Sequence, residues 1–178
     1  MDLIQIDDKG LLFVAPEIDN WDLLAERQIK VVIDLDGQVD LGIPSVPDGL
    51  LYLYFPIYDE NLPDLVKLHG LGRFAAEMVQ QKRAVLAHCC MGLNRSPLMA
   101  GVTLTYLGMS GAKAVELLRE KRPGALFNER FASYLASLRP NGEGGRVPKA
   151  LIQSINNSSR RKKSKAGDAR QAGRKENQ

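Results

Sequence analysis

The segment AHCCMGLNRSP, residues 87–97, contains the residues of this sequence that are best suited to covalent chemistry. It holds both cysteines of the chain, Cys89 and Cys90, and an arginine, Arg95, that stands six positions after the first cysteine. A thiolate is a strong nucleophile, and a guanidinium binds two oxygens of a phosphate group through its planar fork. This spacing therefore indicates a loop that binds a phosphate ester and attacks it.

The residues around the two cysteines predict a strand, a tight loop and then a helix. The strand is AVLAH, residues 84–88, and the helix starts near Ser96 and Pro97, since proline is favoured in the first turn of a helix. Backbone N–H groups of such a loop and the positive end of the helix dipole attract a dianion, and Gly92 lets the backbone bend toward it. The same positive field favours the thiolate form of Cys89. We therefore expect Cys89 to lie beneath a bound phosphate, in position for in-line attack.

The run from His88 to Ser96 resembles the His-Cys-x5-Arg-Ser signature of the cysteine-dependent protein tyrosine phosphatases, and the short chain is similar to their dual-specificity branch. The resemblance covers roughly residues 10–138. It implies a phosphoprotein phosphatase that hydrolyses phosphotyrosine, and in a dual-specificity enzyme also phosphoserine and phosphothreonine, through a phosphocysteine intermediate. It implies no metal and no other cofactor. Cys89 is then the nucleophile, because Cys90 stands one position too close to Arg95.

The resemblance also gives roles to the other residues of the loop. Ser96 hydrogen-bonds the cysteine sulfur and helps it to leave when water hydrolyses the intermediate, and His88 orders the loop. Cys90 is either a small packing residue or a partner that protects an oxidised Cys89. The residues expected around the bound phosphate are Cys90, Met91, Gly92, Leu93, Asn94 and Arg95.

The reaction also needs an acid that protonates the departing ester oxygen. In the family this acid is an aspartate on a mobile loop upstream of the cysteine. Asp59, within FPIYDENLP, stands thirty residues before Cys89, between a predicted strand and a predicted helix. Glu60 and Asp64 are competing candidates, and an ordinary acidic residue at the start of a helix is the structural alternative.

A different phosphatase signature lies upstream. VVIDLDGQV, residues 31–39, resembles the first motif of the haloacid dehalogenase phosphatases, in which Asp34 would be the nucleophile, Asp36 the acid and Mg²⁺ the cofactor. Gln38 stands where that motif has threonine, and no downstream Gly-Asp-x-x-x-Asp supplies the metal site. We therefore interpret this segment as a core strand that runs into a polar turn.

Two alternative functions stay open beside the phosphoprotein phosphatase. GLNRS, residues 92–96, is similar to the Gly-Phe-Asn-Arg-Thr of RNA 5′-triphosphatases with the same fold, although those enzymes generally lack the acid that Asp59 would provide. The first alternative is therefore an RNA 5′-phosphatase. The second is a catalytically dead module that binds phosphorylated residues, which would have no need of Asp59.

The elements that must position these residues alternate between strand and helix, which predicts an α/β domain with a central, mostly parallel sheet flanked by helices. Predicted strands cover residues 11–14, 31–35, 50–57 and 84–88. Predicted helices start at Asp19 or Asn20 and run through Trp21, Leu24 and Ile29, span about residues 63–82, follow Ser96, follow Ser110, and run from Asn128 to about residue 138.

Composition supports a single domain, since 178 residues with 44% hydrophobic and 25% charged residues are ordinary for a globular protein. The sequence contains no apolar run near the ~20 residues that span a bilayer, so we expect no membrane partner. Adjacent cysteines do not form a disulfide framework, and they also lack the spacing of zinc ligands. The lack of a disulfide framework favours a cytoplasmic protein, and the spacing of the cysteines predicts no metal site.

Charge divides the chain into two parts. Ten basic and three acidic residues lie between Asn141 and Gln178, whereas the whole chain has a net charge of +3. We therefore expect a phosphatase domain over residues 1–140 and a basic, disordered tail over residues 141–178. The tail is either solvated or makes a weak contact with a polyanion such as RNA.

Overall fold

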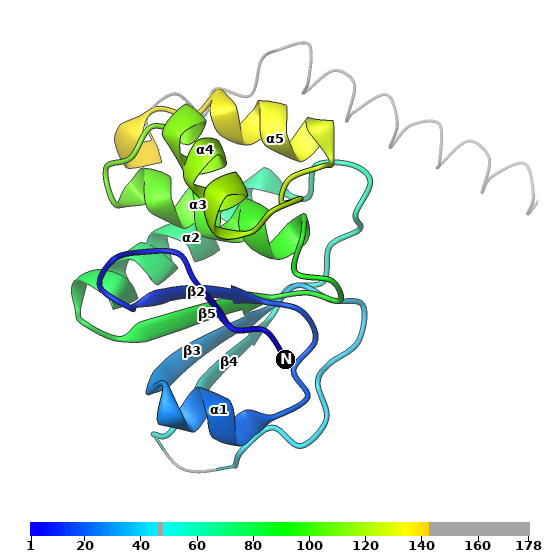
Figure 1. The fold of residues 1–178 in the computed structure, drawn as a ribbon, viewed down its shortest axis with the longest axis vertical. Helices are drawn as coiled ribbons and strands as arrows, with labels where there is room; N and C mark the ends of the chain where they lie inside the picture. The colour runs from blue at the N-terminus through cyan, green and yellow to red at the C-terminus, as the bar shows by residue number, and fades with distance from the viewer. Residues whose placement is uncertain (46–47, 143–178) are drawn as a thin grey trace, which may run out of the picture. The chain divides into compact units, whose positions relative to one another are not determined.

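The computed structural model describes residues 1–45 and 48–142, and within them five strands form one sheet (Figure 1). The strand order is β1-β2-β5-β3-β4, in which β1 and β2 are antiparallel and all other neighbours are parallel. This arrangement confirms the predicted mostly parallel sheet. The strands are β1 (Ile4–Gln5), β2 (Leu12–Ala15), β3 (Ile29–Asp34), β4 (Leu51–Tyr54) and β5 (Ala84–His88).

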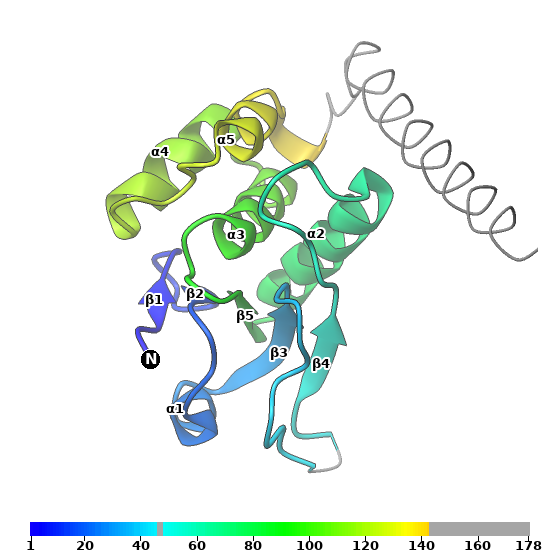
Figure 2. The same ribbon diagram turned by 90° about the vertical axis from the view of Figure 1, so that its right-hand side faces the viewer.

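Helices cover both faces of the sheet, in unequal number (Figures 1 and 2). One short helix covers one face, where Leu24 and Trp21 pack against Phe13, Val32 and Leu86 of the strands. The other helices form the opposite layer, which confirms the predicted α/β fold. They are α1 (Trp21–Glu26) on the first face and α2 (Leu65–Gln80), α3 (Arg95–Tyr106), α4 (Gly111–Lys121) and α5 (Glu129–Ala136) on the second, with a 3-10 turn, η1 (Pro140–Gly142), at the end of the described residues.

Polar side chains start four of the helices. Asn20, Asp64, Ser110 and Asn128 each precede a helix and accept hydrogen bonds from backbone N–H groups of its first turn. Such a cap satisfies donors that have no partner within the helix, so it fixes where the helix begins. Asn20, and not Asp19, caps α1.

One prediction about the first part of the chain was wrong, and one strand was missed. The helix that starts at Trp21 ends at Glu26, and Ile29 is the first residue of β3. Gln28 has a φ of 55°, which leaves the helical region, and Ile29 is buried in the sheet. The two-residue strand β1 was not predicted, because two residues are too few to show an alternating pattern.

The helical layer is closely packed where α4 meets α5. A Cβ atom built on Gly111 would lie 1.7 Å from the carbonyl oxygen of Leu135, so only glycine fits at this position. Among the described residues, no helix is long and apolar enough to cross a membrane. Apart from Asn141 and Gly142, the predicted basic tail lies outside the part of the chain that the structure describes.

Candidate active site

The carboxyl ends of three neighbouring parallel strands lie side by side and form the base of the site. His88 of β5 is in register with Ala15 of β2 on one side and with Asp34 of β3 on the other. Ligands of open α/β sheets bind outside the carboxyl ends of the strands. The loop from Cys89 to Asn94 leaves the sheet at this edge and leads directly into α3.

The structure brings Cys89 and Ser96 together and keeps Cys90 apart. The Cys89 sulfur lies 3.4 Å from the Ser96 hydroxyl, and the residue is only 2% exposed, whereas Cys90 is exposed. The Cys89 backbone N–H donates to the carbonyl oxygen of Ala15 at 3.4 Å, which ties the start of the loop to β2. This geometry supports Cys89 rather than Cys90 as the reactive thiol.

Gly92 allows the loop to curl against the end of β2. Its φ is +66°, and a Cβ atom there would lie 2.8 Å from backbone atoms of Ala15 and Pro16. A larger residue would therefore push the loop away from the strand. The outer side of the loop is supported by carbonyl contacts, in which Met91 accepts from Arg122 at 3.4 Å and Leu93 accepts from the Leu126 backbone at 2.7 Å.

Arg95 is held by one of its terminal nitrogens. Nη1 donates to the carbonyl oxygen of Leu35 at 3.2 Å and to the carboxylate of Asp36 at 2.9 Å. Nε, by contrast, is buried and has no hydrogen-bond partner among the described residues. An unsatisfied buried donor is costly unless a ligand satisfies it, so the free edge of the guanidinium suits an anion.

Charges around Arg95 keep it protonated. Burial lowers the pKa of Arg95, but the hydrogen bond that Arg95 donates to Asp36 and the negative charges of Cys89, Asp36 and Asp59 outweigh it, so that the pKa is raised. Asp59 is thus close enough to act on the arginine. The Cys89 thiol, the charge of Arg95 and the carboxyl group of Asp59 therefore lie around the same loop.

Asp59 is tied to the loop by two asparagines. Asn94 donates to one carboxylate oxygen at 2.9 Å and Asn128 donates to the other at 3.2 Å. The two asparagines also contact each other, since the Asn128 backbone N–H donates to the Asn94 side chain at 3.0 Å. The competing acids have other contacts than Asp59. The Asp64 side chain caps α2, and Glu60 accepts a hydrogen bond from Asn128 through its backbone carbonyl.

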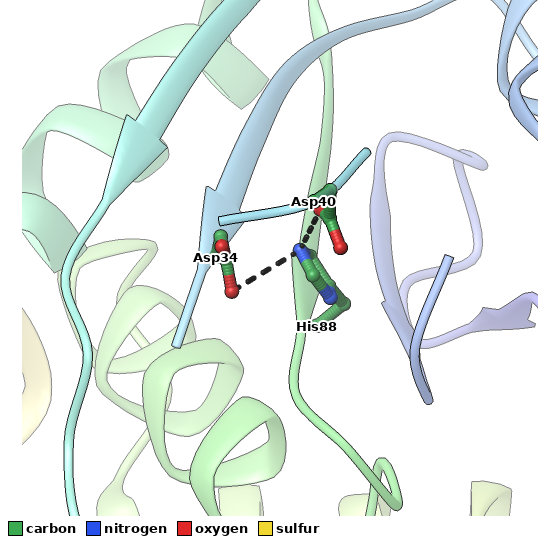
Figure 3. A group of neighbouring side chains, drawn as sticks. All are labelled: Asp34, Asp40 and His88. Carbon is green, nitrogen blue, oxygen red and sulfur yellow. Dashed lines mark ion pairs between the residues drawn. The ribbon is translucent and has the colours of Figure 1, made fainter. Parts of the chain in front are cut away.

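His88 belongs to a buried polar cluster beneath the loop (Figure 3). Its Nε2 lies 2.9 Å from a carboxylate oxygen of Asp40 and 3.5 Å from one of Asp34. The Tyr52 hydroxyl lies 2.5 Å from Asp34 and 2.9 Å from Asp40. Burial lowers the pKa of His88 despite the two carboxylates, and burial raises the pKa of Asp40 despite the histidine.

Several residues of this arrangement were missed from the sequence. Asp36 was considered only as part of the rival signature, in which Asp34 would be a nucleophile, and the structure instead pairs Asp36 with Arg95 and encloses Asp34 completely. Asn128 was expected only to cap a helix. The aspartates at the end of β3 and after it were a signal for a functional role. Their contact with Arg95 could not be predicted, because it depends on β3 lying next to β5.

Comparison with known proteins identifies the family. Residues 12–112 match the family described as "Polymorphic toxin system, DSP-PTPase phosphatase". The chain is 30% identical over 148 residues to dual specificity protein phosphatase 1B of Arabidopsis thaliana, a match that covers 80% of this chain and 85% of that protein. The chain therefore belongs to the dual-specificity branch of the cysteine-dependent protein tyrosine phosphatases, as the loop signature predicted.

Other relatives agree with this assignment. The chain is 30% identical over 100 residues to human protein tyrosine phosphatase type IVA 3, a match that covers 54% of this chain and 57% of that protein. Among solved structures, human DUSP28 is 26% identical with a TM-score of 0.63, over 75% of this chain and 89% of that one. The structure of Tk-PTP in the active form is 28% identical with a TM-score of 0.59, over 74% of this chain and 91% of that one.

Proposed function

We propose that this chain hydrolyses phosphotyrosine in proteins, and also phosphoserine and phosphothreonine, through a phosphocysteine formed on Cys89. The observation that carries the proposal is the buried Nε of Arg95, which has no partner among the described residues. Arg95 begins the helix that follows the loop of the Cys89 thiol. A phosphate bound there would accept hydrogen bonds from the guanidinium and from backbone N–H groups of the loop. The positive charge of Arg95 would also attract the phosphate of a substrate toward the sulfur.

The roles of the other residues follow from their positions. In the first step the Cys89 thiolate attacks phosphorus, and Asp59, in its protonated form, gives its proton to the leaving oxygen. In the second step water attacks the phosphocysteine, the Asp59 carboxylate accepts the proton from that water, and the sulfur leaves as a thiolate. Ser96, at 3.4 Å from the sulfur, supports this departure by a hydrogen bond.

The arrangement around Asp59 favours turnover over a binding module. A module that only holds a phosphorylated residue needs no acid, whereas here two asparagines hold Asp59 against the loop. We also propose that the protein acts in the cytoplasm, because a reducing compartment keeps Cys89 in its thiol form. The substrate is then a phosphorylated protein or peptide.

Phosphate release from a panel of substrates tests the proposal. We expect phosphotyrosine peptides to be hydrolysed in the presence of EDTA, since the route through Cys89 uses no metal. Cys89→Ser should reduce the rate by more than about 10⁴-fold while it preserves binding of the phosphopeptide, because a serine hydroxyl is far less ionised than a thiol. The matched control, Cys90→Ser, should keep most of the activity.

Other outcomes of the same panel would overturn the proposal. Activity confined to 5′-triphosphate RNA would indicate the RNA 5′-phosphatase instead. Tight binding of phosphopeptides by the wild-type chain without phosphate release would indicate a binding module.

A further inference from the structure

The buried cluster beneath the catalytic loop offers three ligand groups of a metal site. One ligand atom each from Asp34, Asp40 and His88 lies within 4.8 Å of the other two. His88 and Asp34 have no exposed side-chain surface, and the side chain of Asp40 is 6% exposed. Figure 3 shows the ring nitrogen of His88 facing both carboxylates.

The hydrogen bonds of the cluster join Tyr52 with the two aspartates and do not include His88. Within residues 1–45 and 48–142, neither Nδ1 nor Nε2 of His88 has a hydrogen-bond partner, although Nε2 is only 2.9 Å from an Asp40 oxygen. Nε2 thus faces the two carboxylates at close range without a well-aligned hydrogen bond to either. A buried polar atom without a partner calls for an occupant that the surrounding protein does not supply.

Proton counting points the same way. The Tyr52 hydroxyl has one hydrogen, but it lies within hydrogen-bond distance of both Asp34 and Asp40, and it also accepts from the Asp40 backbone N–H at 3.1 Å. The hydroxyl can donate to only one of the two carboxylates, so Tyr52 leaves the other without a donor. A positive charge placed between His88 and the two aspartates would balance them, and burying it is favourable only if it is coordinated.

The distances suit a small divalent cation. Ligands at bond lengths of about 2.0–2.2 Å in a tetrahedral site lie about 3.4 Å from one another. The separations from Nε2 are 2.9 Å to Asp40 and 3.5 Å to Asp34, so small shifts would admit an ion. Imidazole with two carboxylates suits Zn²⁺, whereas Mg²⁺ and Ca²⁺ prefer oxygen ligands alone.

An acidic pocket provides an approach to the cluster. A pocket of about 660 Å³ is lined by Asp40 together with Glu17, Asp19 and Asp36, and no basic residue is among the described residues of its lining. Such a surface raises the local concentration of cations. Asp40 belongs both to the pocket and to the cluster, so an ion that enters the pocket meets its first ligand there.

We propose that Asp34, Asp40 and His88 form a binding site for a zinc-type divalent cation, with Tyr52 orienting the two carboxylates from outside. The site is separate from the proposed hydrolysis and does not depend on it. Asp34 also accepts from the Asp36 backbone at 2.8 Å, and Asp36 holds Arg95, so the ion would fix the turn that positions the arginine. The expected role is stabilisation of this edge of the sheet.

Zinc titration of the full-length chain tests the site, in a Cys89→Ser/Cys90→Ser background that removes the competing thiols. The chain contains two histidines, so the ring resonances in an NMR spectrum distinguish the sites. We expect one Zn²⁺ per chain, a shift of the His88 resonance and no shift of His69. Excess Mg²⁺ should not displace the ion.

Substitution separates ligands from neighbours. Asp40→Asn should weaken zinc binding by at least about tenfold, because a ligand charge is lost. Glu17→Gln, which removes a charge from the same pocket but no ligand, should change the affinity by less than about threefold. If Asp40→Asn fails to fold, the NMR titration of the parent decides.

Three results would overturn the proposal. The first is no zinc binding up to about 100 μM, which would mean that a proton on His88 balances the cluster. The second is a resonance shift at His69 instead of His88. The third is displacement of Zn²⁺ by Mg²⁺, which would exclude a nitrogen ligand.

Discussion

The two histidines of the chain, a partly buried His69 and a fully buried His88, differ in their hydrogen bonds. His69, on α2, has both ring nitrogens within hydrogen-bond distance of tyrosine hydroxyls, at 2.8 Å from Tyr106 and 2.5 Å from Tyr134. Both tyrosine rings also pack edge-on against it. His88, on β5, has no hydrogen-bond partner at either nitrogen in the part of the chain that the structure describes.

The contrast separates a region that holds the fold together from one that is prepared to bind something. Around His69 the donors and acceptors of α2, α3 and α5 complete one another, which stabilises the packing of these helices. At the carboxyl ends of the strands, His88 and Arg95 both have buried nitrogens without a hydrogen-bond partner among the described residues. Changes near His69 should therefore affect stability, and changes near the loop should affect catalysis.

After Cys89→Ser, the largest effect is expected from Asp59→Asn. Loss of the acid should slow hydrolysis of phenyl or alkyl phosphates by about 10²–10⁴-fold, the usual contribution of general acid catalysis. An ester with a very good leaving group should lose much less, because its oxygen needs no proton. Steady-state rates on the two kinds of ester measure this, with Glu60→Gln as the control. Equal losses on both esters would remove Asp59 from this role.

Arg95→Lys should reduce kcat/KM by about 10²–10³-fold, the cost of losing a positioned donor to a developing anion. Lysine keeps the charge but not the two-point contact with phosphate. The unfolding midpoint in urea should change little. Arg119→Lys, the same change outside the loop, is the matched control, and a similar rate for both variants would contradict a phosphate-binding role for Arg95.

A smaller effect, on stability alone, is expected from His69→Gln. The variant loses part of two hydrogen bonds, which we expect to lower the free energy of unfolding by about 1–2 kcal/mol while kcat is retained. Urea unfolding and phosphate release, measured on the same samples, check the two halves of this statement. A loss of activity without a loss of stability would reverse the assignment of the two regions.

The pH dependence of that stability has a definite sign. Burial, followed by the charge of Arg73, lowers the pKa of His69, so the unfolded chain binds this proton more readily than the folded one. Stability should therefore fall as the pH drops below the ordinary histidine value of about 6.5. In His69→Gln the fall should be shallower but still present, because the pKa of His88 is lowered as well. An unchanged slope would contradict the prediction.

The smallest effect is expected from a chain that ends at Pro140, which tests the predicted domain boundary. If the basic segment that follows is only solvated, stability and kcat on a small substrate should stay the same. If it recruits a polyanion, binding of the full chain to RNA should fall steeply with salt and disappear on truncation. Filter binding at several salt concentrations distinguishes the two outcomes, and we favour the first.

The sequence predicted the parts of the site that lie close together along the chain. The segment of nine residues from the end of β5 to the start of α3 contains His88, Cys89, Gly92, Arg95 and Ser96. Their spacing alone indicated a phosphate-binding loop. Strands and helices were also largely predictable, because apolar periodicity and capping residues are local signals.

What the sequence did not predict depends on contacts between distant segments. Asp36 reaches Arg95, and Asp40 reaches His88, because β3 lies next to β5 in the sheet. Asn128 reaches Asp59 across 69 positions of sequence. No local pattern encodes such pairs, since they follow from the order of the strands and from the packing of the last helix.

The close contact of Gly92 with Ala15 and Pro16 has a consequence for how the protein acquires activity. The catalytic loop takes its shape against the end of β2, a strand that lies more than 70 residues before the loop in the sequence. Contacts between segments so far apart in sequence form late, because closing the intervening chain costs entropy before the contact repays it. A partly folded chain thus carries the cysteine and the arginine but has no cradle to hold a phosphate. We therefore expect no phosphatase activity until β2 has paired with β5 and the loop has closed against it.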